Sequence, residues 1–229
     1  MQTGLARWMQ AGLLLAAACA FVPASGEQPT GGAAIRPLAD TKVAPDGFFP
    51  TYLWTTDRGC TGQIGNGPLL DDFTNRWYSS HLKAAGEQSL INAARAAPQN
   101  VHLRFTWLRS FHRPIVVRID EQPDGTATIE AKMLSGAGGY DPGKIAKRVS
   151  RDLTPSEWSA IKDRLGRGEL QSEPAGHCDL GMDGAQWIVE LVEDGRYAFF
   201  ERWSPDGGAV RDTGLAMLAL TGFELQPIY

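Results

Sequence analysis

Hydrophobic and polar side chains alternate along several stretches of the chain. In residues 101–110, VHLRFTWLRS, every second side chain from Val101 to Trp107 is apolar and those between are polar. This period of two is typical of a half-buried β-strand. The same kind of pattern recurs in residues 115–120, 126–134, 186–193 and 196–203. Asp194-Gly195 separates the last two stretches and is the strongest short-range hairpin signal in the sequence. The pattern therefore predicts antiparallel hairpins.

Three other stretches carry helical signals. Asp71 and Asp72 precede an apolar face with a spacing of four, and acidic residues suit the start of a helix. The sequence Thr154-Pro155-Ser156-Glu157 combines an N-cap, a first-turn proline and a residue that can complete a capping box. Residues 210–221 form a last, largely apolar segment. Residues 144–153 fit a helix and a strand equally well, so both alternatives stay open.

The order of these elements predicts the fold class. A helix, several strands, a helix, a hairpin and a helix follow one another without regular β-α-β alternation. We therefore expect an α+β fold, an antiparallel sheet built from hairpins with about three helices packed on one face. Residues 47–229 are predicted to form one domain.

The N-terminus is typical of an export signal. Arg7 precedes an apolar run of about ten residues, and small residues follow it. Residues 1–24 are interpreted as a signal peptide, or as a lipoprotein signal that ends before a lipidated Cys19. Residues 25–46, rich in Gly, Pro and Ala, are expected to be a flexible tether. The apolar run is too short to cross a bilayer, and we expect no transmembrane span in the mature chain.

Two cysteines remain after this processing, Cys60 and Cys178. An even pair in an oxidising compartment favours a disulfide. Free structural thiols are one alternative. A Cys178 nucleophile activated by His177 is another, which the opposite directions of neighbouring side chains on an extended chain disfavour.

Charged residues are segregated along the chain. Residues 88–119 contain no acid but five arginines, whereas residues 168–195 contain seven acids and no Lys or Arg. One interpretation is that these segments pair across neighbouring strands. The other is an anion-binding face, for which the candidate contacts are Arg104, His112, Arg113 and Arg118. The formal charge of −4 becomes −5 once Arg7 is removed, which argues against nucleic-acid binding.

Several motifs fail on inspection. The glycine-rich stretch SGAGGYDPGK, residues 135–144, begins like a nucleotide-binding loop, but Ile145 stands where a Ser or Thr must hold Mg²⁺. Residues 179–190 resemble a calcium-binding loop, but Gly181 occupies a ligand position. No histidine has metal-ligand spacing. We expect no cofactor and no metal.

Four segments resemble a family of uncharacterised exported bacterial proteins. They are RFTWLRSFHRPIVVRI, GAGGYDPGKIAKR, LTPSEW and DGAQWIVELVEDGRYAFFERWSPDGGAVRDTGLAMLALTG. The resemblance covers residues 69–222. It implies export from a bacterial cell and no particular activity.

Together these features favour a non-enzymatic binding or interaction module of the periplasm or outer envelope, with an anionic ligand or an envelope protein as partner. The alternative is a hydrolase acting on envelope material, with carboxylates such as Asp183 and Glu201 as acid and base.

Overall fold

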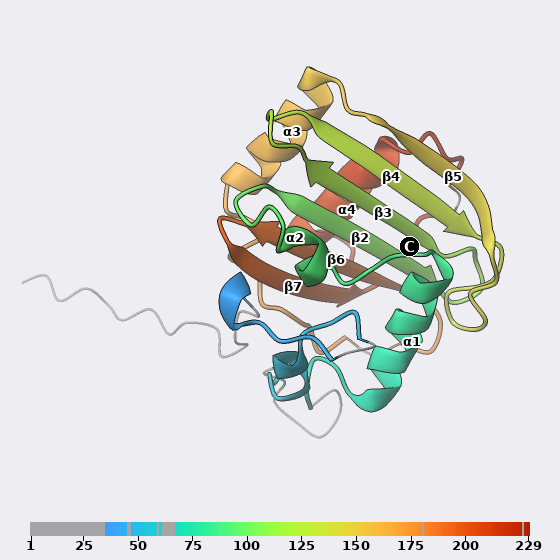
Figure 1. Cartoon of the computed structure of the whole chain (residues 1–229). Coiled ribbons are helices and arrows are strands. Elements are labelled where there is room, and N and C mark those ends of the chain that lie inside the picture. Colours follow the sequence, from blue (N-terminus) through green and yellow to red (C-terminus); the bar gives the residue numbers. More distant parts are fainter. Residues whose placement is uncertain (1–34, 45–46, 59, 61–66, 180, 226) are drawn as a thin grey trace, which may run out of the picture.

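The computed structural model describes residues 35–44, 47–58, 60, 67–179, 181–225 and 227–229. Its centre is one seven-stranded sheet in the order β1-β7-β6-β2-β3-β4-β5, and every pair of neighbouring strands is antiparallel (Figure 1). The strands are β1 (Ile35–Pro37), β2 (His102–Arg109), β3 (Ile115–Glu121), β4 (Ala127–Leu134), β5 (Ile145–Asp152), β6 (Ala185–Glu193) and β7 (Arg196–Trp203). The expected α+β class and its antiparallel sheet of hairpins are confirmed.

The α-helices lie on both faces of the sheet, and the expectation of about three helices on one face is wrong. α3 (Pro155–Gly166) and α4 (Ala209–Ala219) cover one face, whereas α1 (Asp72–Ala84) and α2 (Leu90–Ala94) cover the other (Figure 1). Two short 3₁₀ helices, η1 (Leu38–Asp40) and η2 (Thr51–Trp54), precede α1 in the chain. The physical reason is that the central strands need cover on both sides, because all eight residues of β2 are buried.

The face beneath α3 and α4 is almost wholly apolar. Phe105, Trp107 and Trp187 lie at its centre with the apolar stripe of α3. α3 begins as predicted, because the Thr154 hydroxyl and the Glu157 carboxylate form a reciprocal capping box. Gly214 allows α4 to pack closely on this face. A Cβ at this position would lie only 2.8 Å from the rings of Phe105 and Trp187.

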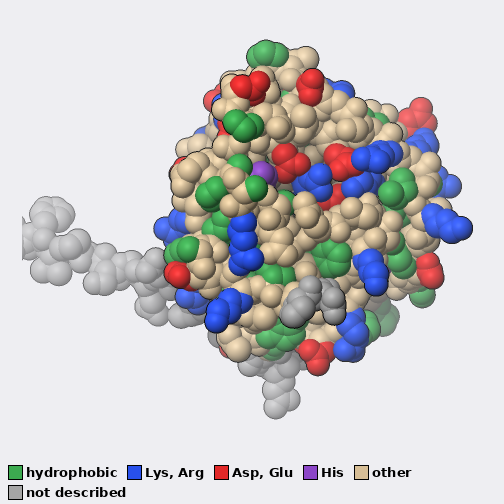
Figure 2. Space-filling model, in the orientation of Figure 1, with side chains coloured by type: hydrophobic (Ala, Val, Ile, Leu, Met, Phe, Trp, Pro, Cys, Tyr) green, Lys and Arg blue, Asp and Glu red, His purple; other side chains and the backbone are tan. Residues whose placement is uncertain are grey.

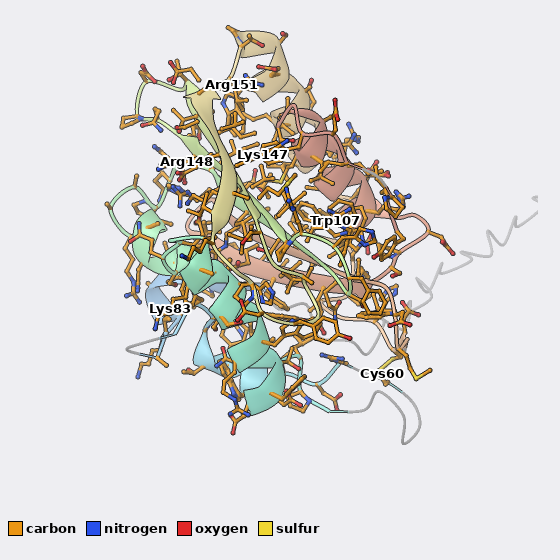
Figure 3. All side chains as sticks on the ribbon, turned by 90° about the vertical axis from the view of Figure 1, so that its right-hand side faces the viewer. Cys60, Lys83, Trp107, Lys147, Arg148 and Arg151 are labelled. Atoms are coloured by element: carbon orange, nitrogen blue, oxygen red, sulfur yellow. A yellow bond between two sulfur atoms is a disulfide. The ribbon has the colours of Figure 1, made fainter. Side chains whose placement is uncertain are left out.

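The open alternative in residues 144–153 is settled, because β5 is a strand paired with β4 along its length. β5 is an edge strand, and most of its side chains are exposed. Lys147 and Arg148 lie on opposite sides of this strand, with Lys147 on the side of the buried Trp107 (Figure 3).

Part of the predicted tether, residues 25–46, belongs to the folded domain. Ile35–Pro37 pairs with β7 as the strand at the opposite edge of the sheet, and Leu38 is buried. The Arg95 guanidinium also donates to the Thr41 carbonyl oxygen at 2.9 Å. These hydrogen bonds hold a segment whose composition suggested flexibility. The predicted signal peptide, Cys19 and residues 25–34 lie outside the described residues.

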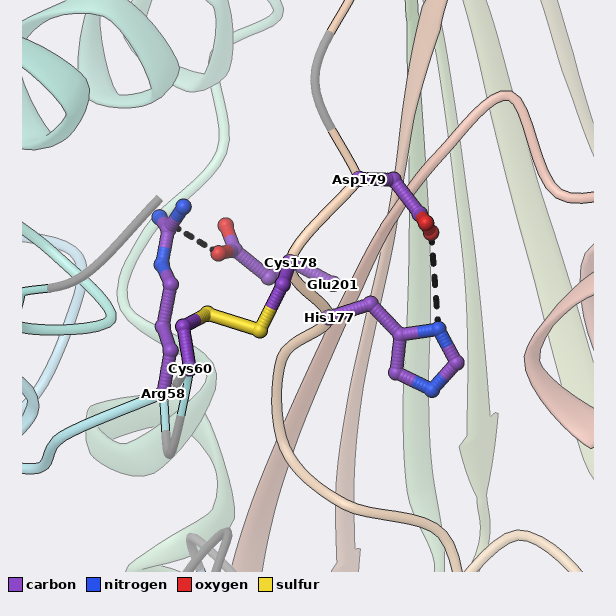
Figure 4. The surroundings of a disulfide bond; sticks show 6 residues. All are labelled: Arg58, Cys60, His177, Cys178, Asp179 and Glu201. Atoms are coloured by element: carbon purple, nitrogen blue, oxygen red, sulfur yellow. Dashed lines mark ion pairs between the residues drawn. A yellow bond between two sulfur atoms is a disulfide. The ribbon is translucent and has the colours of Figure 1, made fainter. Parts of the chain in front are cut away.

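The predicted disulfide between Cys60 and Cys178 is confirmed. It joins residues 118 positions apart. Beside it, Arg58 and Glu201 form an ion pair at 2.6 Å, and His177 lies 3.4 Å from Asp179 on the other side (Figure 4). A catalytic Cys178 thiolate is excluded in this state because the sulfur is already bonded. Within the described ranges, no helix is both long and apolar enough to cross a bilayer.

Candidate anion-binding site

The glycine-rich stretch, residues 135–144, forms the turn between β4 and β5 and is called the glycine turn below. It packs against the turn between β2 and β3. The Gly138 N–H donates to the carbonyl oxygens of Arg109 and His112, at 2.9 and 3.0 Å. The Gly139 N–H donates to the Ser110 oxygen at 3.1 Å. Two hairpin ends that are distant in sequence are thereby joined at one end of the sheet.

The glycine turn needs glycine at two positions because main-chain atoms of other residues lie where a Cβ atom would stand. A Cβ on Gly136 would lie 1.9 Å from the Asp141 oxygen, and one on Gly138 would lie 2.4 Å from the Arg109 nitrogen. Gly143 has a φ of +70°, which side chains disfavour. A phosphate loop must also open a helix, whereas β5 begins at Ile145. The stretch is a docked turn, in agreement with the rejection of a nucleotide site.

α1 holds the glycine turn from the other side. The Trp77 indole nitrogen donates to the Gly138 oxygen at 2.6 Å. His81 is fully buried, and its ring nitrogens lie 2.9 Å from the Trp77 oxygen and 3.4 Å from the Ala137 oxygen. Burial lowers the pKa of His81, which favours the neutral ring. His81 is therefore a structural residue that joins α1 to the glycine turn.

A pocket of about 450 Å³ lies beside this junction, on the α3 and α4 side of the sheet. We call it the basic pocket, because Arg109, His112, Arg113 and Lys147 line it and Glu224 is the one acidic residue in its lining. Its remaining lining residues are Phe111, Met133, Ser135 and Gly136.

Arg109 is the least exposed cation of this pocket, at 3%. Its guanidinium lies 4.1 Å from the centre of the Trp107 ring. Its two terminal nitrogens donate to the main-chain oxygens of Pro227 and Arg113, at 3.2 and 3.1 Å. The Nε atom is buried and has no hydrogen-bond partner among the described residues. Burial lowers the pKa of Arg109, and the nearby Tyr229 opposes that shift.

The other cations of the basic pocket are more accessible. Arg113 and Lys147 are exposed, and within the described chain neither forms an ion pair. The His112 ring lies 2.7 Å from the Tyr229 hydroxyl, which fixes its orientation. The pocket thus offers three cationic side chains, two of them free to move toward a ligand.

Arg104 and Arg118, the other predicted anion contacts, are engaged elsewhere. Arg104 is fully buried and pairs with Glu190 at 2.6 Å, its partner in the β2–β6 ladder. Arg118 pairs with Glu87, Asp120 and Glu130, at 2.6, 2.7 and 3.0 Å. Assigning Arg104 to a ligand was wrong, because no surface reaches it. Pairing across strands is confirmed for Arg104 and Glu190.

These pairs belong to a charged layer beneath α1 and α2. Glu87 joins Arg104, Arg118 and Lys132, and its distances to the last two are 2.6 Å. Burial raises the pKa of Glu190, and the adjacent Arg104 opposes that shift. On the surface, acidic and basic side chains are mixed near the middle of this face, beside a histidine (Figure 2). Because the carboxylates of this layer neutralise its arginines and lysine, the layer offers no excess positive charge to an anion.

The two carboxylates suggested for a hydrolase lie in different environments. Glu201 is buried between Arg58 and the Tyr78 hydroxyl, and burial raises its pKa. Asp183 is exposed in the turn before β6. Neither lines the basic pocket. The part of the chain that the structure describes also holds no group of three or more His, Cys, Asp or Glu that suits a metal ion.

Arg109 and Lys147 are the residues that sequence reasoning missed. Arg109 is the last residue of β2, and a buried strand end gives no sign of a pocket. Lys147 comes from a different hairpin, and the cross-strand register from Trp107 through Ile115 and Met133 brings it to the same end of the sheet. No protein-family model matches this chain, and no curated protein is significantly similar to it in sequence.

Proposed function

We propose that this protein is an exported, non-enzymatic binding module that holds an anionic group in the basic pocket. Arg109 would form the base of the site, with Arg113 and Lys147 at its opening and His112 at its side. Of the four contacts expected from the sequence, His112 and Arg113 are retained in this proposal, and Arg104 and Arg118 are replaced by Arg109 and Lys147.

The observation that carries the proposal is the buried guanidinium of Arg109. A buried charge is costly unless it is paired, because it has lost its hydration. The other well-buried arginines, Arg104 and Arg202, each have a carboxylate partner at 2.6 Å or less. Among the described residues, Arg109 contacts two carbonyl oxygens and the face of an indole, Tyr229 lies nearby, and no ion pair with Asp or Glu forms. An anion in the adjacent pocket would supply the missing charge.

The chemistry of the cations favours a carboxylate or phosphate group. A guanidinium presents donors in a planar fork that matches two oxygens of such groups, and an ammonium adds a mobile point charge. Charge-assisted hydrogen bonds of this type contribute roughly 1.5–3 kcal/mol each. Two arginines and one lysine are therefore sufficient for specific binding of a small anion.

Two features support an exported location. The N-terminus has the layout of a signal peptide, and disulfides persist in oxidising compartments such as the bacterial periplasm. We place the module in the periplasm or outer envelope. A lipid on Cys19 would anchor it there, and residues 20–34 would then separate the anchor from the sheet.

Isothermal titration calorimetry with inorganic phosphate and with citrate, at constant ionic strength, tests the proposal. We expect saturable binding at one site. The double variant Arg113→Gln/Lys147→Gln removes two exposed cations without disturbing the core, and should weaken binding by at least roughly tenfold.

The matched control is Lys83→Gln/Arg196→Gln, which removes the same two residue types from exposed positions outside the basic pocket. It should bind as the natural protein does. Absence of saturable binding for both anions, or equal weakening in the two double variants, would refute the proposed site.

A further inference from the structure

A second pocket, of about 460 Å³, lies on the other side of the glycine turn. We call it the aromatic pocket. It is formed between α1, the glycine turn and the ends of β2 and β7. Its lining residues are Phe73, Arg76, Trp77, Ser80, Ser110, Gly139, Tyr140, Met182 and Trp203.

The aromatic pocket exposes an unusual amount of apolar surface. Phe73 is 68% exposed, Tyr140 is 66% exposed and Met182 is 96% exposed. Folding normally buries such side chains, and contiguous exposed apolar surface often marks a binding site. Polar groups of Arg76, Ser80 and Ser110 are interspersed in the same lining. The surface therefore suits a ligand that is itself partly apolar and partly polar.

The two pockets meet at a pair of exposed rings. Phe111 lines the basic pocket and Tyr140 lines the aromatic pocket, and their stacked rings have centroids 6.1 Å apart. Phe111 is itself 58% exposed. The turns that carry these rings are joined by the backbone hydrogen bond from Gly138 to Arg109. The two rings therefore form a stacked pair that joins the lining of one pocket to the lining of the other.

Resting on the anion site proposed above, we propose that the ligand is an acidic oligosaccharide. Its acidic group would bind Arg109, Arg113 and Lys147, and neighbouring sugar rings would pack on Phe111, Tyr140 and Phe73. Two pockets on opposite sides of a sheet end require an extended ligand, which a compact anion is not. A pyranose ring has an apolar face that packs on aromatic rings while its hydroxyl groups stay hydrated.

The exposure of the rings favours a sugar over an acyl chain. An acyl chain gains free energy in proportion to the apolar area removed from water. Rings that are two-thirds exposed would leave much of such a chain in contact with solvent. A saccharide gains from contact on one face alone, so an open surface of aromatic and hydroxyl side chains matches it better.

The test uses oligogalacturonate and oligomannuronate of four to eight sugars as probes. Fully methyl-esterified oligogalacturonate serves as the neutral comparison, and inorganic phosphate as the anion alone. We expect at least one acidic oligosaccharide to bind about tenfold or more tightly than phosphate does. The esterified form should bind at least about tenfold more weakly than the acid.

Two variants separate this inference from the proposed function. Phe73→Ala/Tyr140→Ala removes two exposed rings, so the fold should persist, and it should weaken oligosaccharide binding about tenfold while phosphate affinity is unchanged. Arg113→Gln/Lys147→Gln should weaken binding of both probes. The control is Ile145→Ala, an exposed apolar side chain outside both pockets, which should change neither affinity.

Some results would overturn the inference alone. These are phosphate binding at the basic pocket without tighter binding of either acidic oligosaccharide, or oligosaccharide binding that does not depend on the rings. Polyglutamate or anionic lipid vesicles binding more tightly than both acidic oligosaccharides, with the same dependence on Phe73 and Tyr140, would also overturn it. Loss of all phosphate and oligosaccharide binding would refute the anion site as well.

Discussion

The indole nitrogen of Trp77 lies 2.6 Å from the main-chain oxygen of Gly138, 61 residues away in the sequence. This hydrogen bond fastens α1 to the glycine turn, and the same turn carries the backbone contacts to Arg109 and Ser110. The positions of both pockets therefore depend on one docked turn.

Replacing the indole tests this dependence. Trp77→Phe removes the donor and leaves the Gly138 oxygen without that bond, so we expect a loss of about 1–3 kcal/mol in the free energy of unfolding. Urea denaturation measures it. Trp54→Phe is the control, because the Trp54 indole donates to an exposed Asp72 carboxylate at 3.3 Å, and its loss should matter little. Equal losses of stability in Trp77→Phe and Trp54→Phe would mean that the hydrogen bond from α1 does not stabilise the glycine turn.

The close approach of Gly138 to β2 gives a second prediction. In Gly138→Ala the new methyl group would lie 2.4 Å from the Arg109 nitrogen, and backbone must move to admit it. We expect destabilisation of about 1–3 kcal/mol, together with weaker phosphate binding because Arg109 shifts.

Gly166→Ala is the matched control for that substitution. Gly166 ends α3 and has open space where its Cβ would stand, so alanine there should be neutral or stabilise by up to about 1 kcal/mol. A Gly138→Ala protein as stable as natural protein would show that the turn is not tightly docked.

The buried pair of Arg104 and Glu190 gives a third prediction. Arg104→Met leaves Glu190 buried with the Tyr197 hydroxyl as its remaining partner at 2.9 Å, and should cost about 3–5 kcal/mol. The double variant Arg104→Met/Glu190→Leu should recover much of this loss, because no unpaired charge remains. Both free energies come from urea denaturation.

Arg148→Gln breaks a far more exposed pair with Glu130 and should cost less than about 1 kcal/mol. The interpretation of Arg104 as a structural residue fails if Arg104→Met is as mild as this control.

The capping box of α3 predicts an acid-dependent contribution to stability. Hydrogen bonds from Arg151 and from Thr154 lower the pKa of Glu157 to about 2. Because the folded pKa lies below the unfolded value, the contribution is complete above the unfolded pKa and disappears as the pH falls toward about 2. Glu157→Gln should therefore be less stable than natural protein at neutral pH, and the difference should shrink between about pH 5 and pH 2.

Equilibrium unfolding at a series of pH values measures this difference. Glu169→Gln removes an exposed carboxylate beyond the other end of α3 and serves as the control. A difference for Glu157→Gln that is independent of pH would contradict the role given to its carboxylate.

The disulfide predicts a large loss of stability on its removal. In the chain-entropy model, a loop of 118 residues corresponds to about 5 kcal/mol, and the Cys60→Ser/Cys178→Ser variant should lose up to that amount. Mass spectrometry without reduction should find these cysteines two hydrogens lighter than free thiols. Two freely alkylated thiols in exported protein would contradict the bridge.

Local signals in the sequence were sufficient for much of the sheet and for α3. The Asp194-Gly195 hairpin forms with positive φ at both residues, at 51° and 67°, as its composition predicts. The capping box at Thr154 also depends only on neighbours within one turn. Such features are predictable because the atoms that stabilise them lie close together in sequence.

Apart from the disulfide, which the count of cysteines predicted, most features that depend on distant segments were not predictable. Arg104 alternates with apolar residues and was a candidate contact for an anionic ligand, but Glu87 and Glu190 reach it from two other segments. β1 has three residues, too few to show a period. The basic pocket needs Lys147 from β5 near Arg109 from β2, and that placement depends on the strand order and register of the whole sheet.

The two edges of the sheet have a consequence for aggregation. One edge is the short β1, which ends in Pro37 and offers few free backbone groups for pairing. The other is β5, whose exposed Lys147 and Arg148 would meet their like-charged counterparts if two copies met edge to edge. The shortness of β1 and its proline disfavour pairing at one edge, and repulsion between like charges disfavours pairing at β5. Both edges therefore disfavour growth of the sheet into fibres by edge-to-edge pairing.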